Sequence, residues 1–252
     1  IDSYPFILME GALGERLKRE FDLDISGTVA MADLIYQQKG RMALKTLWNE
    51  YMDIAHRYQL PFLATTPTRR ANKERVYMAG YNESIITDNV DFLRTIKETA
   101  NVNMYIGGLM GCKGDAYTSE RALNQEEAIA FHSWQASLFK SVGVDFLYAG
   151  IMPVLSEAIG MAVAMSDTDI PYIISFTIQR NGKLIDGHTI NDAIYYIDNH
   201  VSNKPVCYMT NCVHPDIVYE ALSHKFNQTQ MVKNRFWGIQ ANTSRLSYKE
   251  LD

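Results

Sequence analysis

The stretch Pro205-Val206-Cys207-Tyr208-Met209-Thr210-Asn211-Cys212-Val213-His214-Pro215 begins with apolar, β-forming residues and ends in polar ones. Valine, tyrosine and threonine favour extended backbone, and the His-Pro pair predicts a turn where the strand stops. A helix is expected directly afterwards, over residues 216–224. Cys212 therefore stands at the end of a predicted strand, where a thiol can serve as a metal ligand or as a nucleophile.

The same succession of a short apolar run and a helical stretch repeats along the whole chain. The runs that predict strands cover residues 6–9, 61–67, 104–106, 145–149, 171–178, 205–212 and 236–242. Helical periodicity lies between them, most clearly over residues 43–58, 85–100 and 154–165. The spacing is close to the roughly 30 residues of a βαβ unit, which predicts an α/β fold with a parallel sheet.

Two architectures fit this alternation, a doubly wound open sheet and an eight-stranded (β/α) barrel. No Gly-x-Gly-x-x-Gly turn follows the first strand, which argues against the dinucleotide-binding open sheet. Polar residues gather at the C-terminal end of each predicted strand, as they do in a barrel. We predict a (β/α)8 TIM-type barrel forming one domain over residues 1–252, C-terminally incomplete because the eighth βα unit is apparently missing from this chain.

The composition of the chain limits the kinds of molecule that it is expected to bind. The chain has 252 residues, 47% of them hydrophobic, and a net charge of −5, so it lacks the positive field that attracts nucleic acid or anionic lipid. No apolar run approaches the roughly 20 residues needed to cross a bilayer. The three cysteines form no disulfide framework, which predicts a reducing, cytoplasmic location. We expect small-molecule ligands, with no nucleic acid and no membrane as partners.

The residues that end the predicted strands are the candidates for a site, because these ends meet at one face of a barrel. They are Glu10 and Gly11, Thr65, Thr66 and Thr68, Gly107 and Gly108, Gly150, Thr177, Asn211 and Cys212, and Asn242. The set has one carboxylate and one thiol. It contains no lysine for a Schiff base and no second carboxylate for glycoside hydrolysis, so it suits a small polar ligand.

Each of these residues also has a purely structural interpretation. A single cysteine in a strand is more often an inert core residue than a ligand, and Cys207, at the start of the same strand, is interpreted that way. His214 shares a strand face with Cys212, but the His-Pro pair fits a turn better than a metal site. The Glu10-Gly11 pair is also compatible with a cap on the first helix.

Six motifs, in order, give the chain a resemblance to the homocysteine S-methyltransferase family. The motifs are Glu10-Gly11-Ala12-Leu13-Gly14, Thr65 to Asn72, Gly111 to Tyr117, Ile174 to Gly187, Asn211-Cys212-Val213-His214-Pro215, and Gly238 to Ser244. The family is a (β/α) barrel that methylates the thiol of homocysteine, to give methionine, with a zinc ion held by three cysteine thiolates.

The resemblance implies that Cys212 is one zinc ligand and that Glu10 binds the homocysteine amino group in place of the usual aspartate. We predict that Glu10, Gly11, Thr65, Thr66, Asn211 and Asn242 line the substrate site. Zinc stabilises a thiolate at neutral pH, and the thiolate attacks the methyl carbon of a sulfonium donor. The leaving thioether is neutral, which agrees with the absence of acid–base pairs among the strand-end residues.

Two departures from the family pattern leave alternatives open. The family's other zinc ligands come from a Gly-Gly-Cys-Cys motif on the eighth strand, and Asp252 precedes any such motif. Gly150 occupies a position where many members have a glutamate that contacts the substrate amine. The alternatives are a methyltransferase for a different thiol or donor, and a non-catalytic ligand-binding barrel derived from the family.

Overall fold

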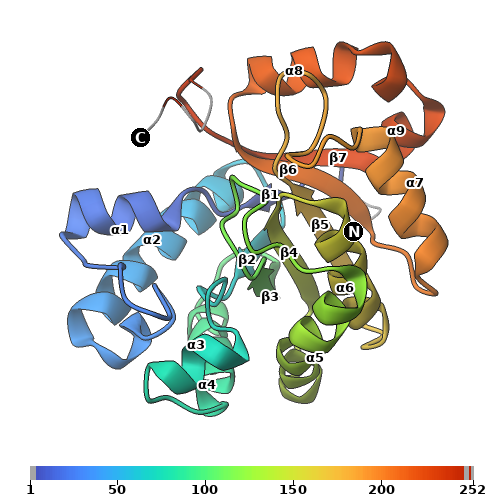
Figure 1. Ribbon diagram of the computed structural model, residues 1–252. Helices are drawn as coiled ribbons and strands as arrows, with labels where there is room; N and C mark the ends of the chain where they lie inside the picture. The colour runs from blue at the N-terminus through green and yellow to red at the C-terminus, as the bar shows by residue number, and fades with distance from the viewer. Residues whose placement is uncertain (1–3, 247–249, 251–252) are drawn as a thin grey trace. The chain divides into compact units, whose positions relative to one another are not determined.

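The computed structural model describes residues 4–246 and residue 250 (Figure 1). They divide into two compact units. Unit 1 contains residues up to 109 together with residues 137–146, and unit 2 contains residues 110–136 and those from 147 onward. Each unit is described by itself, and the formation of one domain over residues 1–252 stays a prediction.

The described strands form one sheet whose order follows the chain, from β1 to β7. The strand pairs within each unit are parallel. The strands are β1 (Leu8–Met9), β2 (Phe62–Thr65), β3 (Met104–Gly111), β4 (Phe146–Met152), β5 (Tyr172–Phe176), β6 (Cys207–Val213) and β7 (Phe236–Ala241). Parallel strands in chain order, joined by helices, define the TIM-type (β/α) barrel class, which confirms the predicted fold. Residues 4–246 and 250 include seven of its strands and no eighth.

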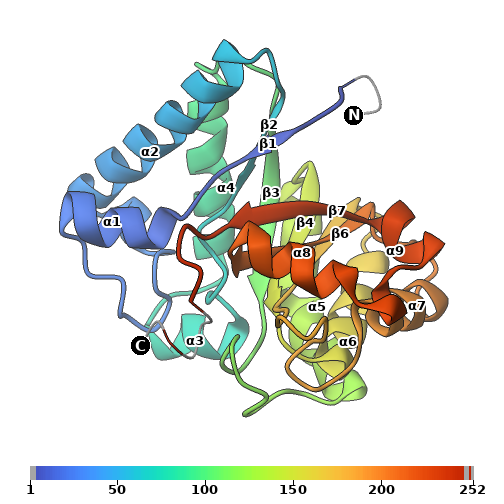
Figure 2. The same cartoon turned by 90° about the horizontal axis from the view of Figure 1, so that it is seen from above.

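In unit 1, helices lie beside the parallel strands β1, β2 and the part of β3 up to Leu109. The helices are α1 (Leu13–Phe21), α2 (Gln38–Arg57), α3 (Lys73–Met78) and α4 (Ser84–Lys97), with a 3₁₀ turn, η1 (Leu34–Tyr36). Figure 2 shows α1, α2 and α4 together beside β1 and β2. The apolar stripe of α2, which includes Leu44, Leu47 and Trp48, is fully buried. The helical periodicity in this part of the sequence therefore produced the core that supports β1 and β2.

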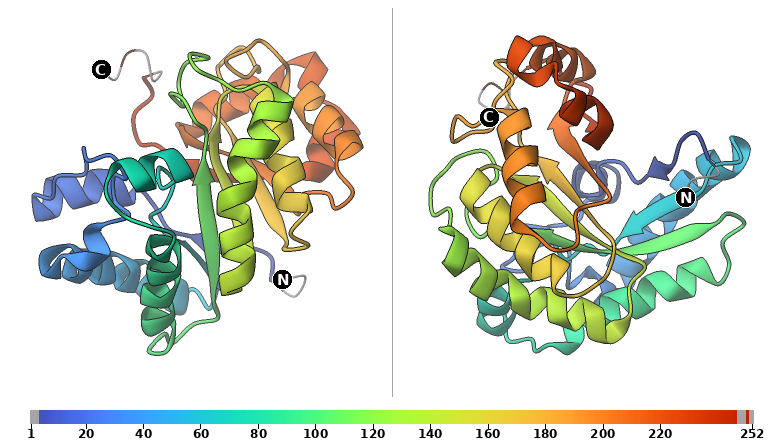
Figure 3. Two further views of the ribbon diagram at one scale, coloured as in Figure 1. Left: turned by 60° about the horizontal axis from the view of Figure 1, so that its bottom comes forward. Right: turned by 90° about the vertical axis from the view of Figure 1, so that its right-hand side faces the viewer.

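In unit 2, helices alternate with strands in the same way. They are α5 (Gln125–Val142), whose last turns belong to unit 1, α6 (Leu155–Ser166), α7 (Ile190–His200), α8 (Pro215–Ser223), η2 (Lys225–Asn227) and α9 (Gln230–Arg235). Figure 3 shows α6 and α7 side by side against β5 and β6. The Tyr148 hydroxyl of β4 donates to Gln240 Oε1 of β7 at 2.8 Å, which ties strands three places apart in the sheet.

Local sequence signals start these helices where they were expected. Asn124 and Glu127 exchange side chain-to-backbone hydrogen bonds at the start of α5, and Thr189 and Asp192 form a capping box at α7. The predicted Asn181-Gly182 turn is present, because Ile178 and Leu184 pair in an antiparallel bridge and Gly182 has a φ of 76°. Asparagine and glycine adopt the backbone conformation of tight hairpin turns readily, so the Asn-Gly pair predicted this hairpin from the sequence.

The third strand is longer than predicted. Gly107 and Gly108 were expected at its end, but β3 continues to Gly111. A Cβ at Gly107 would lie 2.3 Å from Phe146 Cζ, and one at Gly108 would lie 2.6 Å from Phe139 Cγ. The two glycines therefore allow aromatic side chains to pack against the middle of the strand. Their role is close packing, and the strand-end interpretation is wrong.

Burial along the strands follows the parallel-sheet pattern except in β1, which is half-buried, and in β7. Every residue of β4 and β5 is buried, as expected for strands covered on both faces. In β7, residues alternate between exposed and half-buried, and Trp237 is 64% exposed. None of the helices in the described ranges is long and apolar enough to cross a bilayer.

Candidate active site

Cys212 lies in a β-bulge at the end of β6. Asn211 pairs with Gln240 and Val213 pairs with Ala241, so Cys212 is an extra residue without a partner in the β6–β7 register. Its φ is 58°, in the left-handed region that few residues other than glycine and asparagine adopt. The thiol is exposed, in contrast to those of Cys112 and Cys207. Strained backbone that presents a reactive side chain is typical of functional sites.

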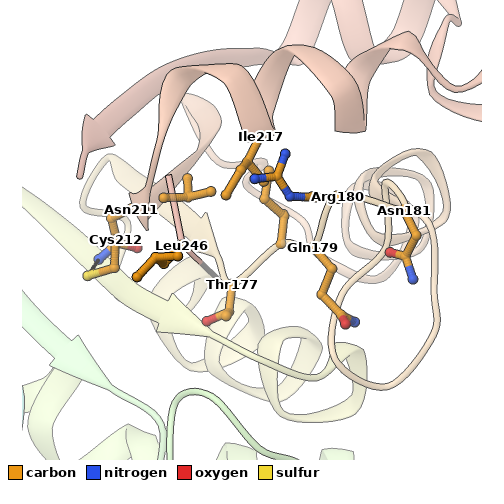
Figure 4. Close-up of a pocket in the computed structure, with 10 residues that line it drawn as sticks. Thr177, Gln179, Arg180, Asn181, Asn211, Cys212, Ile217 and Leu246 are labelled. Atoms are coloured by element: carbon orange, nitrogen blue, oxygen red, sulfur yellow. Dashed lines mark hydrogen bonds between the residues drawn. The ribbon is translucent and has the colours of Figure 1, made fainter. Parts of the chain in front are cut away.

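The bulged residue lines a pocket of about 270 Å³ in unit 2 (Figure 4). Residues from the end of β5, the hairpin after it, the end of β6, helix α8 and the segment after β7 contribute to its wall. They are Thr177, Ile178, Gln179, Arg180, Asn181, Asn211, Cys212, Val213, Ile217 and Leu246. A concave site with a mixed apolar and polar lining suits a small organic ligand.

Asn211 holds the polar side of this pocket in place. Its Oδ1 accepts a hydrogen bond from the Ser175 hydroxyl of β5 at 2.6 Å, and its Nδ2 lies 3.9 Å from Cys212 Sγ. The amide is therefore oriented by the neighbouring strand and presents its N–H groups to the sulfur. Such a donor stabilises negative charge on a thiolate. Asn211 and Cys212 are neighbours in the sequence, and together they place an amide N–H group beside the thiol.

The other residues near this strand have structural roles. His214 caps α8, because its Nδ1 accepts from the backbone N–H of Asp216 at 3.1 Å. This agrees with the interpretation of His-Pro as a turn. Cys207 is buried at the start of β6, and burial raises the pKa of its thiol to about 11. A thiol that resists ionisation is a poor ligand, which confirms Cys207 as core.

Glu10 is the buried carboxylate of unit 1. Both of its oxygens accept from the backbone N–H of Thr65, at 2.9 and 2.8 Å, and Oε1 also accepts from the Thr65 hydroxyl. Helix α1 has Ala12 at its N-cap with no side-chain bond, so Glu10 is not the cap of that helix. Burial raises the pKa of Glu10 to about 8, although the Thr65 hydrogen bonds act in the opposite direction. The site residues Glu10 and Thr65 are therefore brought together at the ends of β1 and β2.

The raised pKa of Glu10 predicts a pH dependence of stability. Between the ordinary value of 4.5 and about 8, the folded protein keeps a proton that the unfolded chain has released. The free energy of unfolding should therefore fall as pH rises through this window, by on the order of 3 to 5 kcal/mol in total. Glu10→Gln, which cannot ionise, should remove that decrease. Urea unfolding at pH 5, 6, 7 and 8 measures it.

Glu15→Gln is the matched control for this experiment. Glu15 is exposed on α1, and its hydrogen bond to Lys18 lowers its pKa. Its replacement should leave the stability decrease between pH 5 and 8 in place. Parallel stability curves for the unmodified protein and Glu10→Gln would show that Glu10 does not titrate in this range.

Thr66 and Gly11 differ in how they could meet a ligand. The Thr66 hydroxyl is fully buried, accepts from the backbone N–H of Leu109 at 3.1 Å and lies 2.7 Å from the Thr68 hydroxyl. These bonds join the end of β2 to β3. Gly11 is exposed, and a Cβ there would lie 3.0 Å from the Tyr51 hydroxyl. Substrate contact by either residue stays a prediction.

Asn242 follows β7 in unit 2. Its backbone N–H donates to Val213 O at 2.9 Å, which places it beside the end of β6, and its Oδ1 accepts from Ser244 N. Asn242 thus lies near the Cys212 bulge, while Glu10, Gly11, Thr65 and Thr66 belong to unit 1. The structure groups the predicted site residues into these two sets.

Two features at the ends of β3 and β4 were not anticipated. Ile151 has a φ of 61°, beside a shift in the β4–β5 register, so a bulge follows Gly150 as one follows Asn211. Glu157 is fully buried and accepts from Lys113 N at 2.7 Å, Leu123 N at 3.4 Å and His132 Nε2 at 3.1 Å. Its position inside a predicted helix gave no sign of these partners, of which Lys113 and Leu123 come from a loop more than 30 residues earlier and His132 comes from α5.

The fit of a metal ion can be judged from the ligands available. Zinc in proteins takes four ligands, of which three or four are side chains. In residues 4–246 and 250, no group of three or more His, Cys, Asp and Glu side chains could hold a metal ion. Of the three cysteines, Cys212 alone is exposed. The described residues thus supply one thiol and not a complete zinc site.

Comparison with known proteins agrees with the fold and the motifs. The chain is 21% identical over 217 residues to the homocysteine S-methyltransferase YbgG of Bacillus subtilis (strain 168), covering 79% of this chain and 67% of that protein. The metallated form of the homocysteine methyltransferase MmuM from Escherichia coli superimposes with a TM-score of 0.74 at 17% identity, over 97% of this chain and 94% of that one. Its oxidized form gives a TM-score of 0.71 at 19% identity, over 88% and 78%.

Fold and site together define a (β/α)-barrel enzyme with a thiol presented at the end of its sixth strand. The family model described as homocysteine S-methyltransferase matches residues 7–250, nearly the whole chain. The chain therefore belongs to the homocysteine S-methyltransferase family and is a methyltransferase.

Proposed function

We propose that this protein transfers a methyl group from a sulfonium donor to the thiol of homocysteine, giving methionine, in a zinc-dependent reaction. The observation that carries the proposal is the exposed, backbone-strained Cys212, which lines the pocket of unit 2. Family membership supports a thiol as the acceptor. The metallated form of MmuM supports a metal in the reaction.

Cys212 is proposed as one zinc ligand, with the remaining ligands outside the described residues. A bound zinc ion would lower the pKa of the acceptor thiol so that the thiolate predominates at neutral pH. Asn211 would orient the Cys212 sulfur through its Nδ2. Thr177, whose hydroxyl donates to Ala116 O at 2.8 Å, would fix another part of the pocket wall.

The chemistry requires little from the protein beyond orientation. The acceptor thiol loses its proton to solvent, and its sulfur forms a bond to the methyl carbon as the bond from that carbon to the sulfonium sulfur breaks. The electron pair of the broken bond stays on the donor sulfur, which leaves as a neutral thioether. Reaction rate then depends on holding the two sulfur atoms in line with the methyl carbon.

Glu10 is proposed to bind the amino group of homocysteine. Its ionised form pairs with an ammonium group, so homocysteine binding should lower its pKa from about 8. Gly150 has no side chain to supply the second carboxylate found in many family members. This leaves Glu10 as the acidic partner and keeps a different acceptor thiol as the second candidate function.

The test is methionine formation by the protein expressed from its complete coding sequence. Protein loaded with zinc is incubated with homocysteine and either S-methylmethionine or S-adenosylmethionine, and methionine is measured by mass spectrometry. Production with at least one donor is expected. No methionine with either donor, together with methylation of another small thiol, would replace homocysteine by that acceptor.

A cytoplasmic location is proposed on the basis of the cysteines. Cys207 and Cys212 are both free thiols, and Cys212 is exposed. An exposed thiol that must stay reduced suits a reducing compartment.

A further inference from the structure

The pocket beside Cys212 has one charged residue among those described in its lining. Of its lining residues in the described chain, Arg180 alone has an ionised side chain, and the others are apolar, amide, hydroxyl or thiol groups. Figure 4 shows Arg180, Gln179 and Asn181 on one side of the pocket and Cys212 on the other. A ligand that spans the pocket would therefore lie near the Cys212 thiol at one end and near the positive charge of Arg180 at the other.

The guanidinium of Arg180 is held in place by two hydrogen bonds, which engage only part of its N–H groups. Its Nη1 donates to Glu220 Oε1 of α8 at 2.8 Å, and its Nη2 donates to Arg245 O at 2.8 Å. A guanidinium has five N–H groups in a planar fork that matches a carboxylate. The Arg180–Glu220 pair is about half exposed, and an ion pair of that exposure contributes little to stability. A ligand carboxylate can therefore join or replace Glu220 at small loss.

We infer that Arg180 forms a subsite for the α-carboxylate of an amino-acid sulfonium donor whose sulfur lies toward Cys212. The inference deepens the proposed function, on which it rests. A donor such as S-methylmethionine has this chemistry, since it has an α-carboxylate at one end and a sulfonium sulfur near the other. The positive charge of Arg180 also disfavours the reverse orientation of a sulfonium donor, because like charges repel.

The neighbouring residues support this assignment. Gln179 is fixed by donation from its Nε2 to Leu184 O at 3.0 Å, and Asn181 Oδ1 accepts from Lys183 N at 3.1 Å. The hairpin that contains Arg180 is therefore ordered by its own side chains. Because the hairpin has this internal order, little of its backbone entropy is lost when Arg180 binds a carboxylate.

The experiment compares ligands with and without the carboxylate. S-methylmethionine and its carboxamide are titrated by calorimetry into the protein expressed from its complete coding sequence and into its Arg180→Ala variant. The unmodified protein should bind the acid about 10- to 100-fold more tightly than the amide. Arg180→Ala should bind acid and amide equally.

Arg245→Ala is the control variant, because Arg245 is an exposed arginine near Arg180 that pairs with Asp216 and does not line the pocket. It should keep the discrimination, and its carbonyl group still accepts from Arg180. Glu220→Gln should strengthen binding of the acid or leave it unchanged. Equal binding of acid and amide by the unmodified protein, or unchanged discrimination in Arg180→Ala, would overturn the inference.

The outcome can be separated from that of the proposed function. Absence of methionine formation by protein that still discriminates acid from amide through Arg180 would count against the reaction and leave the subsite standing. Methionine formation with an identical rise in KM for S-methylmethionine and for trimethylsulfonium, which has no carboxylate, in Arg180→Ala would count against the subsite alone.

Discussion

Cys212→Ala is expected to lose bound zinc and to lower the rate of methyl transfer by more than about 100-fold, since even residues that merely support a metal ligand have effects of about 10- to 100-fold. The physical reason is the number of ligands. A zinc site with three protein thiolates becomes underfilled when one is removed, and the acceptor thiol is then no longer held as a thiolate. Zinc per protein molecule, measured by mass spectrometry of the metal after dialysis, gives the direct readout.

Cys207→Ala separates this effect from a general effect of losing a cysteine. Cys207 is on the same strand, five residues earlier, and is buried. Its replacement should keep zinc and activity. Because Cys212 is exposed, its own replacement by alanine should leave the urea midpoint nearly unchanged. Stoichiometric zinc in Cys212→Ala would remove Cys212 from the metal site.

Glu157→Ala is expected to produce the largest loss of stability. The substitution leaves two backbone N–H groups, those of Lys113 and Leu123, and the His132 ring without the carboxylate they contact. Glu157 and His132 are both completely buried, so water cannot replace the missing acceptor. Each unsatisfied buried donor costs about 1 to 3 kcal/mol, which gives a total of roughly 3 to 5 kcal/mol. Urea unfolding at pH 7 measures this value.

Glu127→Ala is the matched control for that loss. Glu127 also accepts from a backbone N–H, that of Asn124 at 3.1 Å, but it is exposed at the start of α5. Water can take over its role, and the loss should be about 1 kcal/mol or less. Similar urea midpoints for the two variants would show that Glu157 does not hold the loop by its hydrogen bonds.

The importance of Glu157 extends to the pocket. The carboxylate binds both ends of the loop between Lys113 and Leu123, and Ala116 in this loop accepts from the Thr177 hydroxyl. Thr177 lines the pocket with Cys212. A fully buried group thus supports one wall of the site through two successive sets of hydrogen bonds.

Much of the fold is determined locally and was accessible from the sequence. The apolar runs predicted β1 to β7, and the Asn124–Glu127 and Thr189–Asp192 pairs predicted helix starts. Both kinds of signal act between residues that are close in the sequence. Asn211 and Cys212 were placed at the end of a strand for the same reason. Periodicity and capping depend only on nearby residues, so they can be recognised in a single sequence.

Tertiary structure alone decided the environment of each side chain. The Cys212 bulge depends on the register between β6 and β7, the raised pKa of Glu10 depends on its burial, and the role of Glu157 depends on a loop distant in sequence. Gly107 was misplaced for the same reason, since the ring that excludes its Cβ belongs to Phe146, 39 residues later. Register, burial and long-range contact arise only when separate elements pack together, so sequence could name the reactive residues while packing set their chemistry.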